Sequence, residues 1–308
     1  MSIVYWSSAQ RGQVWQAWLA EHASDLEFYI WPQTGDPEKV RYLVTWEIPD
    51  NLLDRFPHLE VIFSVGAGAD QFTAQPIPDS VSIVRMIEPG LTDDMAAYIT
   101  FSVISLHRGM PRYLQQQQQR QWIKHDAIAA SGCRVGILGL GYLGQASARV
   151  LTMLGYPCSG WSRTQKQVEG VTSYFGEDQL RAFLASSDIL VCLLPLTDLT
   201  RGLLDYRLFE QLPKGACLVH AGRGQQLNHC DLLDALDRGQ LSHAIIDVTD
   251  PEPLPADHPF WMHPSVWLTP HIASETHAES AVKVLLDNIR RHQQGQPMIG
   301  LIDKTRGY

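Results

Sequence analysis

Near the middle of the 308-residue chain stands the stretch Cys133-Arg134-Val135-Gly136-Ile137-Leu138-Gly139-Leu140-Gly141-Tyr142-Leu143-Gly144. Its apolar beginning predicts a short strand, its glycines predict a tight turn, and residues 145–154 predict a helix. Gly139 permits the turn, Gly141 lets a pyrophosphate approach the backbone, and Gly144 lets the helix pack against the strand. In this context the three glycines predict a dinucleotide site whose phosphates lie at the helix N-terminus.

The size and composition of the chain predict two globular domains. A hydrophobic content of 45% and a charged content of 19% are ordinary for a folded protein of 308 residues. A net charge of −9 creates no field that attracts nucleic acid or an anionic membrane, so we expect neither as a partner. The N-terminus lacks the pattern of a signal peptide, and no long apolar run follows, so we expect a cytoplasmic protein.

The cysteines predict neither a disulfide framework nor a metal site. They are odd in number and far apart in the sequence, and we interpret them as small core residues. They are Cys133, Cys158, Cys192, Cys217 and Cys230.

The first 90 residues alternate short β-type runs with helical ones, which predicts a small parallel sheet with covering helices. The predicted strands are 3–6, 26–31, 42–46 and 61–65, with a helix at 14–19 and turns at 52–59. The last of these strands leads into Val65-Gly66-Ala67-Gly68-Ala69-Asp70, which has no side chain larger than methyl at four successive positions. This segment is either a tight turn or a nest of backbone N–H groups that holds a small carboxylate.

Residues 95–106 predict a helix that is apolar on nearly every face, with Thr92-Asp93-Asp94 as its cap. We expect such a helix to be buried and to cross between the two domains. The five glutamines at 115–119 predict a solvated helical face rather than a disordered tract.

The chain after the glycine turn repeats strands and helices, which predicts a doubly wound sheet. The predicted strands are 156–161, 188–194, 216–220, 244–248 and 266–269, and the predicted helices are 177–184, 206–212 and 230–236. A last helix, with apolar residues Ala281, Leu285 and Ile289 at i, i+4 and i+8, is expected to return to the first domain.

Three chemically active side chains follow the later strands. Arg223 lies in Gly222-Arg223-Gly224, Glu252 follows the strand near Asp247, and His271 follows the strand near Thr269. Because ligands bind at the carboxyl ends of parallel strands, we expect these side chains to converge there.

The glycine turn, Gly-Arg-Gly, Glu252-Pro253-Leu254-Pro255 and Pro270-His271 together resemble the D-isomer-specific 2-hydroxyacid dehydrogenase family over essentially the whole chain. Within that family the chain resembles the bacterial group that reduces glyoxylate and hydroxypyruvate. Shared phrases include Gly66-Ala67-Gly68-Ala69-Asp70, Trp161-Ser162-Arg163-Thr164 and Arg306-Gly307-Tyr308. The resemblance implies an α/β fold with two doubly wound parallel-sheet domains. A Rossmann domain, residues 98–275, is inserted in a flavodoxin-like substrate-binding domain formed by 1–97 and 276–308.

The resemblance also implies a mechanism that the chemistry of the residues supports. Reduction of a 2-keto acid needs a hydride donor, a proton donor for the carbonyl oxygen and a cation for the carboxylate. A neighbouring carboxylate favours imidazolium, so Glu252 is expected to keep His271 cationic as the proton donor. Arg223 is expected to bind the substrate carboxylate through its planar fork, assisted by backbone N–H groups of Ala67 and Gly68.

We expect the cofactor to be NADPH. An NAD site places an acid about 20 residues beyond the glycine turn to bind the ribose 2′-hydroxyl, whereas this chain has Ser162-Arg163-Thr164 there and no acid before Glu169. A hydroxyl and a guanidinium suit a 2′-phosphate. The cofactor contacts implied by the resemblance are Gly139, Gly141, Tyr142, Leu143, Gly144, Ser162, Arg163, Thr164, Leu194, Pro195, Ala221, Gly222 and Asp247.

Two residues depart from the usual family pattern. His220 stands where asparagine is usual, and Gly222 replaces the more usual alanine. We interpret His220 as a residue at a strand end that is bonded to backbone, not as a second acid.

The sequence therefore predicts an NADPH-dependent reductase that forms glycolate from glyoxylate and D-glycerate from hydroxypyruvate. One alternative is a dehydrogenase of another or bulkier 2-hydroxy acid, and another is a nucleotide-sensing binding protein without turnover. Trp46 is either a wall of the substrate pocket or a core aromatic residue. The resemblance implies a homodimer formed through the nucleotide domain, with Trp122 either as its anchor or in the core.

Overall fold

The computed structural model describes residues 1–68, 70–73 and 77–304. Ala69 of the predicted nest and the terminal Arg306-Gly307-Tyr308 lie outside the described residues. The chain forms two compact units, an N-terminal unit of Met1–Leu91 with Glu275–Tyr308 and a central unit of Thr92–Ser274. The expected first boundary, after residue 97, falls six residues further along the chain than the boundary after Leu91.

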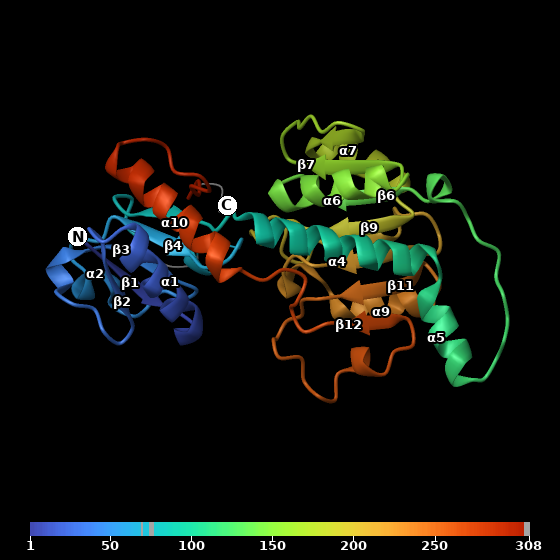
Figure 1. Cartoon of the computed structure of the whole chain (residues 1–308). Helices are drawn as coiled ribbons and strands as arrows, with labels where there is room; N and C mark the ends of the chain where they lie inside the picture. The colour runs from blue at the N-terminus through green and yellow to red at the C-terminus, as the bar shows by residue number, and fades with distance from the viewer. Residues whose placement is uncertain (69, 74–76, 305–308) are drawn as a thin grey trace. The chain divides into compact units, whose positions relative to one another are not determined.

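The N-terminal unit contains a five-stranded parallel sheet in the order β2-β1-β3-β4-β5, which is the order of flavodoxin-like folds (Figure 1). Its strands are β1 (Ser2–Trp6), β2 (Glu27–Ile30), β3 (Val40–Thr45), β4 (Val61–Ser64) and β5 (Ser82–Val84). Its helices are α1 (Ala9–His22), α2 (Leu52–Arg55), α3 (Asp70–Thr73) and α10 (Ala278–Gln293), with a 3-10 turn at Pro37–Lys39.

Helices cover both faces of this sheet. On one face Trp15 and Leu19 of α1 pack in one cluster with Ala281, Leu285 and Ile289 of α10. On the other face the segment containing α2 and α3 packs against alternate residues of β1, β3 and β4. Because both faces are buried, the strands are almost continuously apolar, as parallel strands are.

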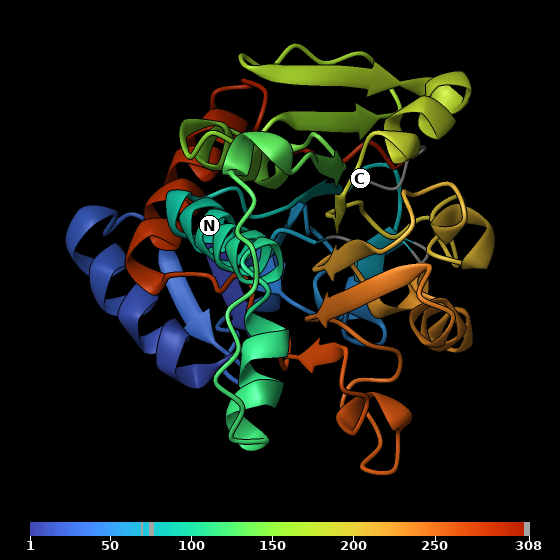
Figure 2. The same ribbon diagram turned by 90° about the vertical axis from the view of Figure 1, so that its right-hand side faces the viewer.

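The central unit contains a seven-stranded parallel sheet in the order β12-β11-β10-β9-β6-β7-β8. Figure 2 shows β11 and β12 side by side in orange. The strands are β6 (Val135–Leu138), β7 (Cys158–Ser162), β8 (Val171–Phe175), β9 (Ile189–Cys192), β10 (Ala216–His220), β11 (Leu241–Ile246) and β12 (Val266–Leu268). The strand order reverses between β6 and β9, as in a dinucleotide-binding sheet with one added strand.

Two layers of helices enclose the central sheet. Helices α4 (Pro89–His107) and α6 (Tyr142–Met153) pack on one face. Helices α7 (Gly176–Ala185), α8 (Tyr206–Phe209) and α9 (His229–Asp237) pack on the other. The predicted fold class, two doubly wound parallel-sheet domains, is confirmed. Among the described residues no helix is long and apolar enough to span a membrane.

The predicted start of the long apolar helix is wrong. Helix α4 begins at Pro89, so Thr92-Asp93-Asp94 lies inside it. The first N–H groups are capped from outside the helix, because the Glu88 carboxylate accepts hydrogen bonds from the N–H groups of Gly90 and Leu91. Ser280 Oγ also donates to the Glu88 carboxylate, which ties the beginning of α4 to α10.

The expectation that α4 is buried all round is also wrong. Met95, Ile99 and Val103 face the core, but Phe101 is 60% exposed and Ile104 is 37% exposed. The next helix, α5 (Met110–Gln118), contains most of the glutamines; they are not uniformly solvated, because Gln116 is buried. An arm of residues 119–129, all described, then runs without helix or strand to a 3-10 turn at Ala130–Gly132 (Figure 1).

Strands β5 and β8 were not predicted, and both lie at sheet edges. Strand β5 is only three residues long, and no side chain of β8 is fully buried, so neither strand gives a clear apolar pattern in the sequence. The interpretation of the cysteines is corrected at one position. Cys133, Cys158 and Cys192 are buried, whereas Cys230 is exposed at the beginning of α9.

Candidate active site

The glycine turn after β6 has the geometry that a dinucleotide needs. Gly139 has φ +107°, in the left-handed region, and a Cβ on Gly144 would lie 1.9 Å from the Gly139 carbonyl oxygen. Gly141 is the N-cap of α6; within the described part of the chain no side chain caps that helix there, and a Cβ on Gly141 would meet no atom within 4 Å. The first N–H groups of α6 therefore face space that suits an anion.

The segment Ser162-Arg163-Thr164 lies at the same edge of the sheet as this turn. Gly139 N–H donates to the Trp161 carbonyl at 2.9 Å, which joins the glycine turn to the end of β7. Ser162 Oγ donates to the Thr164 carbonyl at 2.8 Å and closes a small turn on which Arg163 is exposed. The turn offers donors and positive charge, with no acid in residues 156–168.

The other predicted cofactor contacts follow the strands next to β6. Leu193 N–H donates to the Leu138 carbonyl, so Leu194 and Pro195 leave β9 beside the glycine turn. Ala221 follows β10 and is nearly buried, and its N–H donates to the Cys192 carbonyl. Tyr142, at the beginning of α6, is 56% exposed. Leu143 is partly buried and packs on the core side of the same helix.

The structure brings His271 and Glu252 together. The Nδ1 atom of His271 lies 2.8 Å from Glu252 Oε2, and each side chain is 39% exposed. The other carboxylate oxygen, Oε1, accepts a hydrogen bond from the Thr249 N–H at 3.0 Å, which orients the carboxylate. Because Nδ1 donates its proton to Glu252, Nε2 is the ring atom that can exchange a proton with a ligand.

The loop that carries His271 is held by Asp247, which lies one residue after β11 and is 2% exposed. Its carboxylate accepts hydrogen bonds from Thr269 Oγ1, Ile272 N–H and Ala273 N–H, and its carbonyl accepts one from His271 N–H. These bonds stabilise a left-handed backbone at His271, with φ 56°. Asp247, predicted as a cofactor contact, therefore also fixes the position of the histidine.

Arg223 lies on the neighbouring turn, after β10. A Cβ on Gly224 would lie 2.0 Å from backbone atoms of Thr249, so only glycine lets this turn approach the segment that leads to Glu252. Arg223 Nη1 donates to the Gly222 carbonyl at 2.9 Å. The three predicted side chains thus follow β10, β11 and β12, which are adjacent strands of one sheet.

His220 agrees with the interpretation of a strand-end residue bonded to backbone. It is fully buried, and its Nε2 atom lies 2.9 Å from the Arg223 carbonyl oxygen. The pKa of His220 is lowered to about 4, mainly by burial and in smaller part by the charges of His229 and Arg223, against the hydrogen bond to the Arg223 carbonyl, which raises it. The ring is neutral at physiological pH and is not an acid.

The predicted carboxylate loop, Gly66 to Gly68, belongs to the N-terminal unit. Ser64 Oγ accepts a hydrogen bond from Gly66 N–H and donates to the Gly68 carbonyl, which shapes the loop. Trp46 is 37% exposed, and its ring covers Gly66, because a Cβ there would lie 2.9 Å from the ring. Trp46 is therefore not a core residue, and it lies over the loop that contains Ala67.

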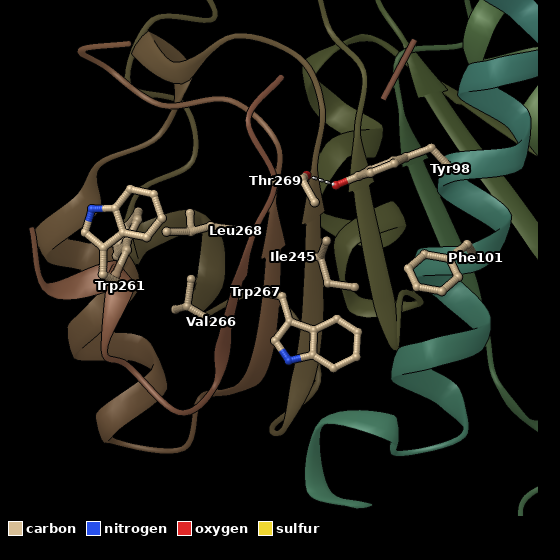
Figure 3. Close-up of a pocket in the computed structure, with 9 residues that line it drawn as sticks. Tyr98, Phe101, Ile245, Trp261, Val266, Trp267, Leu268 and Thr269 are labelled. Atoms are coloured by element: carbon tan, nitrogen blue, oxygen red, sulfur yellow. Dashed lines mark hydrogen bonds between the residues drawn. The ribbon is translucent and has the colours of Figure 1, made fainter. Parts of the chain in front are cut away.

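An apolar pocket of about 460 Å³ lies elsewhere on the central unit. Figure 3 shows it between α4 and the edge of the sheet, with Tyr98 Oη joined to Thr269 Oγ1 by a hydrogen bond of 2.6 Å. Thr269 donates in turn to Asp247, so the hydrogen bonds that hold the His271 loop extend to α4. The pocket is lined by Tyr98, Phe101, Ile245, Phe260, Trp261, Val266, Trp267, Leu268 and Thr269.

Sequence reasoning missed the residues that hold the site in shape. Thr269 and Gln226 bond to a carboxylate or to backbone from another part of the chain, and Ser64 bonds to backbone of the loop that follows it. Their only sequence signal is a polar residue beside a predicted strand end, and that signal is too common to be informative.

Known proteins match the sequence of this chain. The family model of the NAD-binding domain of D-isomer specific 2-hydroxyacid dehydrogenases matches residues 100–273. Glyoxylate/hydroxypyruvate reductase A of Yersinia enterocolitica is 35% identical, and the enzyme of the same name from Serratia proteamaculans is 36% identical. Both alignments cover 100% of this chain and 100% of the relative.

Solved structures also superimpose on this chain over its whole length. A D-isomer specific 2-hydroxyacid dehydrogenase of Xanthobacter autotrophicus, in complex with NADPH and MES, superimposes with a TM-score of 0.96 at 36% identity and covers 100% of this chain and 99% of its own. The NADPH-dependent glyoxylate/hydroxypyruvate reductase of Sinorhizobium meliloti, in complex with NADP and sulfate, gives 0.91 at 33% identity with the same coverage. The chain belongs to the D-isomer-specific 2-hydroxyacid dehydrogenase family and is an NAD(P)-dependent enzyme of that family.

Proposed function

We propose that the protein reduces small 2-keto acids with NADPH, converting glyoxylate to glycolate and hydroxypyruvate to D-glycerate. The observation that carries this proposal is the His271–Glu252 pair, 2.8 Å apart, on a strand-end turn of the sheet that also carries the glycine turn. A proton donor and a dinucleotide site on one sheet edge are what reduction of a carbonyl requires.

The proposal gives Arg223, His271 and Glu252 separate roles. Arg223 binds the substrate carboxylate and polarises the carbonyl, and His271 gives the proton from Nε2 to the carbonyl oxygen. Glu252 stabilises the imidazolium and holds the ring through Nδ1. NADPH, when bound, supplies the hydride.

The proposed cofactor is supported by the segment after β7. Ser162 and Arg163 provide a hydroxyl and a guanidinium where an acid would repel a 2′-phosphate. The proteins of known structure from Xanthobacter autotrophicus and Sinorhizobium meliloti contain NADPH and NADP. Among the residues of the glycine turn, Gly141 leaves room for the pyrophosphate of such a cofactor.

The proposed substrates are supported by the relatives that are named glyoxylate/hydroxypyruvate reductase A. The N-terminal unit supplies Ala67 and Gly68 for the carboxylate and Trp46 as a pocket wall. In this proposal residues 98–275 bind the cofactor, and residues 1–97 with 276–308 bind the keto acid.

A homodimer is proposed as well. The central unit exposes apolar side chains on α4, on α5 and on the arm of residues 119–129, where Trp122 is fully exposed at 103%. This exposure excludes a core role for Trp122 within one chain. A large exposed aromatic side chain beside an apolar helix face is typical of an interface anchor.

A panel of keto acids assayed with both cofactors tests the function. Glyoxylate and hydroxypyruvate with NADPH are expected to give the highest kcat/KM, with pyruvate and a branched keto acid lower. Higher kcat/KM for a bulky keto acid would show that the protein is a different 2-hydroxyacid dehydrogenase. Absence of turnover with every keto acid, while NADPH binds, would show a nucleotide-sensing protein.

A further inference from the structure

Gln226 is a buried polar side chain whose carboxamide is completely engaged. It is 1% exposed and lies in the 3-10 turn Gly224–Gln226 that follows Arg223. Its Nε2 donates to the carbonyls of Leu194 at 3.1 Å and Pro195 at 3.0 Å, and its Oε1 accepts from Arg223 N–H at 2.8 Å. One side chain thus joins the turn of Arg223 to the loop that leaves β9.

The Arg223 carbonyl is held from the opposite direction. His220 Nε2 lies 2.9 Å from it, and because a carbonyl only accepts, Nε2 carries the proton. The other ring nitrogen, Nδ1, is buried and has no hydrogen-bond partner within the described part of the chain. Buried side chains therefore fix both the N–H and the carbonyl of Arg223, which leaves the two peptide units on either side of its Cα little freedom.

The glycine at position 222 is explained by Gln226. A Cβ at Gly222 would lie 2.3 Å from Gln226 Oε1 and 3.1 Å from the Leu194 carbonyl oxygen. A carbon and a non-bonded oxygen do not approach to 2.3 Å, so alanine at this position would displace the carboxamide from its hydrogen bonds to the Leu194 and Pro195 carbonyls and to the Arg223 N–H. The two departures from the family pattern, His220 and Gly222, both contact the structure that holds Arg223.

We propose that Gln226 is the positioning residue of Arg223, that Gly222 is glycine in order to admit its carboxamide, and that together they set the affinity of the site for the substrate carboxylate. This inference rests on the proposed function, in which Arg223 binds that carboxylate. Gln226 itself does not contact the substrate, and its effect is transmitted through the backbone of Arg223.

The first test is the double-mutant cycle of Gln226→Leu with Arg223→Gln. Losing the bonds of Gln226 is expected to lower kcat/KM for glyoxylate by roughly tenfold, mainly through a higher KM. In the Arg223→Gln background, Gln226→Leu is expected to lower kcat/KM by less than about twofold, because the guanidinium that Gln226 positions is already absent. Gln225→Leu, which alters an exposed neighbour, is the matched control and leaves kcat/KM unchanged.

The second cycle combines Gly222→Ala with Gln226→Leu. Gly222→Ala alone is expected to lower kcat/KM by roughly tenfold, and to have little further effect once Gln226→Leu has removed the clashing oxygen. If Gln226→Leu does not fold, as judged by thermal unfolding and NADPH fluorescence, the cycle of Gly222→Ala with Arg223→Gln replaces it.

The outcomes separate this inference from the proposed function. Additive effects in these cycles, or a harmless Gly222→Ala, overturn the positioning role while a damaging Arg223→Gln leaves the proposed function intact. If Arg223→Gln leaves KM and kcat unchanged, Arg223 does not bind the carboxylate, and both proposals fall.

Discussion

At the scale of single residues, the backbone of His271 is the most informative feature of the central unit. A non-glycine residue with φ 56° is uncommon and costs free energy that its surroundings must offset. Here Asp247 offsets it with hydrogen bonds to the N–H groups of Ile272 and Ala273. His271, whose ring pairs with Glu252, has this unfavourable backbone conformation, as expected of a proton donor that is held in one orientation.

Replacing this histidine tests its role. His271→Asn removes the proton donor and is expected to lower kcat for glyoxylate by roughly 10²- to 10⁴-fold, the usual size of general acid catalysis. NADPH affinity, measured by fluorescence titration, is expected to stay close to the wild-type value. His58→Asn, at an exposed position of the N-terminal unit, is the control. A variant that keeps most of its kcat would exclude His271 as the proton donor.

His220 makes stability depend on pH. Burial lowers the pKa of His220 to about 4 in the folded protein, whereas an unfolded histidine titrates near 6.5. Between these values the unfolded chain binds a proton that the folded chain excludes, so stability falls as pH decreases. The stabilising contribution is complete above pH about 6.5 and is lost progressively towards pH about 4.

His220→Asn removes this linkage. The free energy of unfolding, measured with urea at several pH values from about 4 to 7, is expected to fall less steeply in the variant, by up to about 1.4 kcal/mol per pH unit. The control His22→Asn alters an exposed histidine of α1. Identical slopes in the wild type and His220→Asn would mean that folding does not lower the pKa of His220.

At the scale of elements, the turns after parallel strands carry the residues of the proposed site, and the strands hold these turns in register. The turn after β7 is joined to the glycine turn by the bond from Gly139 N–H to the Trp161 carbonyl. Arg163 therefore extends from the same edge of the sheet at which the phosphates of the cofactor are expected.

Arg163→Ala tests the identity of the cofactor. A contact between guanidinium and phosphate contributes about 1.5 to 3 kcal/mol, so KM for NADPH is expected to rise roughly ten- to a hundredfold while KM for NADH barely changes. Arg181→Ala, at an exposed position of α7, is the control. Equal weakening of NADPH and NADH would contradict a contact with the 2′-phosphate.

Some helices and strands have a local sequence signal, and others do not. The glycine turn and the buried strands were predictable, because their signals are local: glycine spacing and runs of apolar residues. Strand β8 was not, because an edge strand with Thr172 and Ser173 in place of apolar residues lacks that pattern. The capping of α4 by Glu88 and the bonds of Gln226 depend on residues that meet only after folding.

At the scale of the whole molecule, the exposed apolar side chains of the central unit are the basis of the proposed homodimer. Phe101 of α4 and Trp122 of the arm are 60% and 103% exposed, which is costly in water. The resemblance to a dimeric family predicted an interface on this unit, although the sequence pattern of α4 alone indicated burial within one chain.

Trp122→Ala tests the homodimer. In size-exclusion chromatography with light scattering, the wild type is expected to show twice the chain mass of 34.6 kDa. The dissociation constant of the dimer is expected to be at least roughly tenfold higher in the variant. Leu199→Ala, which removes another exposed apolar side chain, is the control. A monomeric wild type would exclude this interface.

The most direct test of the central claim is the product formed from hydroxypyruvate. The wild-type protein, incubated with hydroxypyruvate and NADPH, is expected to form one D-glycerate for each NADPH oxidised, and His271→Asn is expected to form it at least about a hundredfold more slowly. Formation of L-glycerate, or tight NADPH binding without any oxidation, would contradict the account.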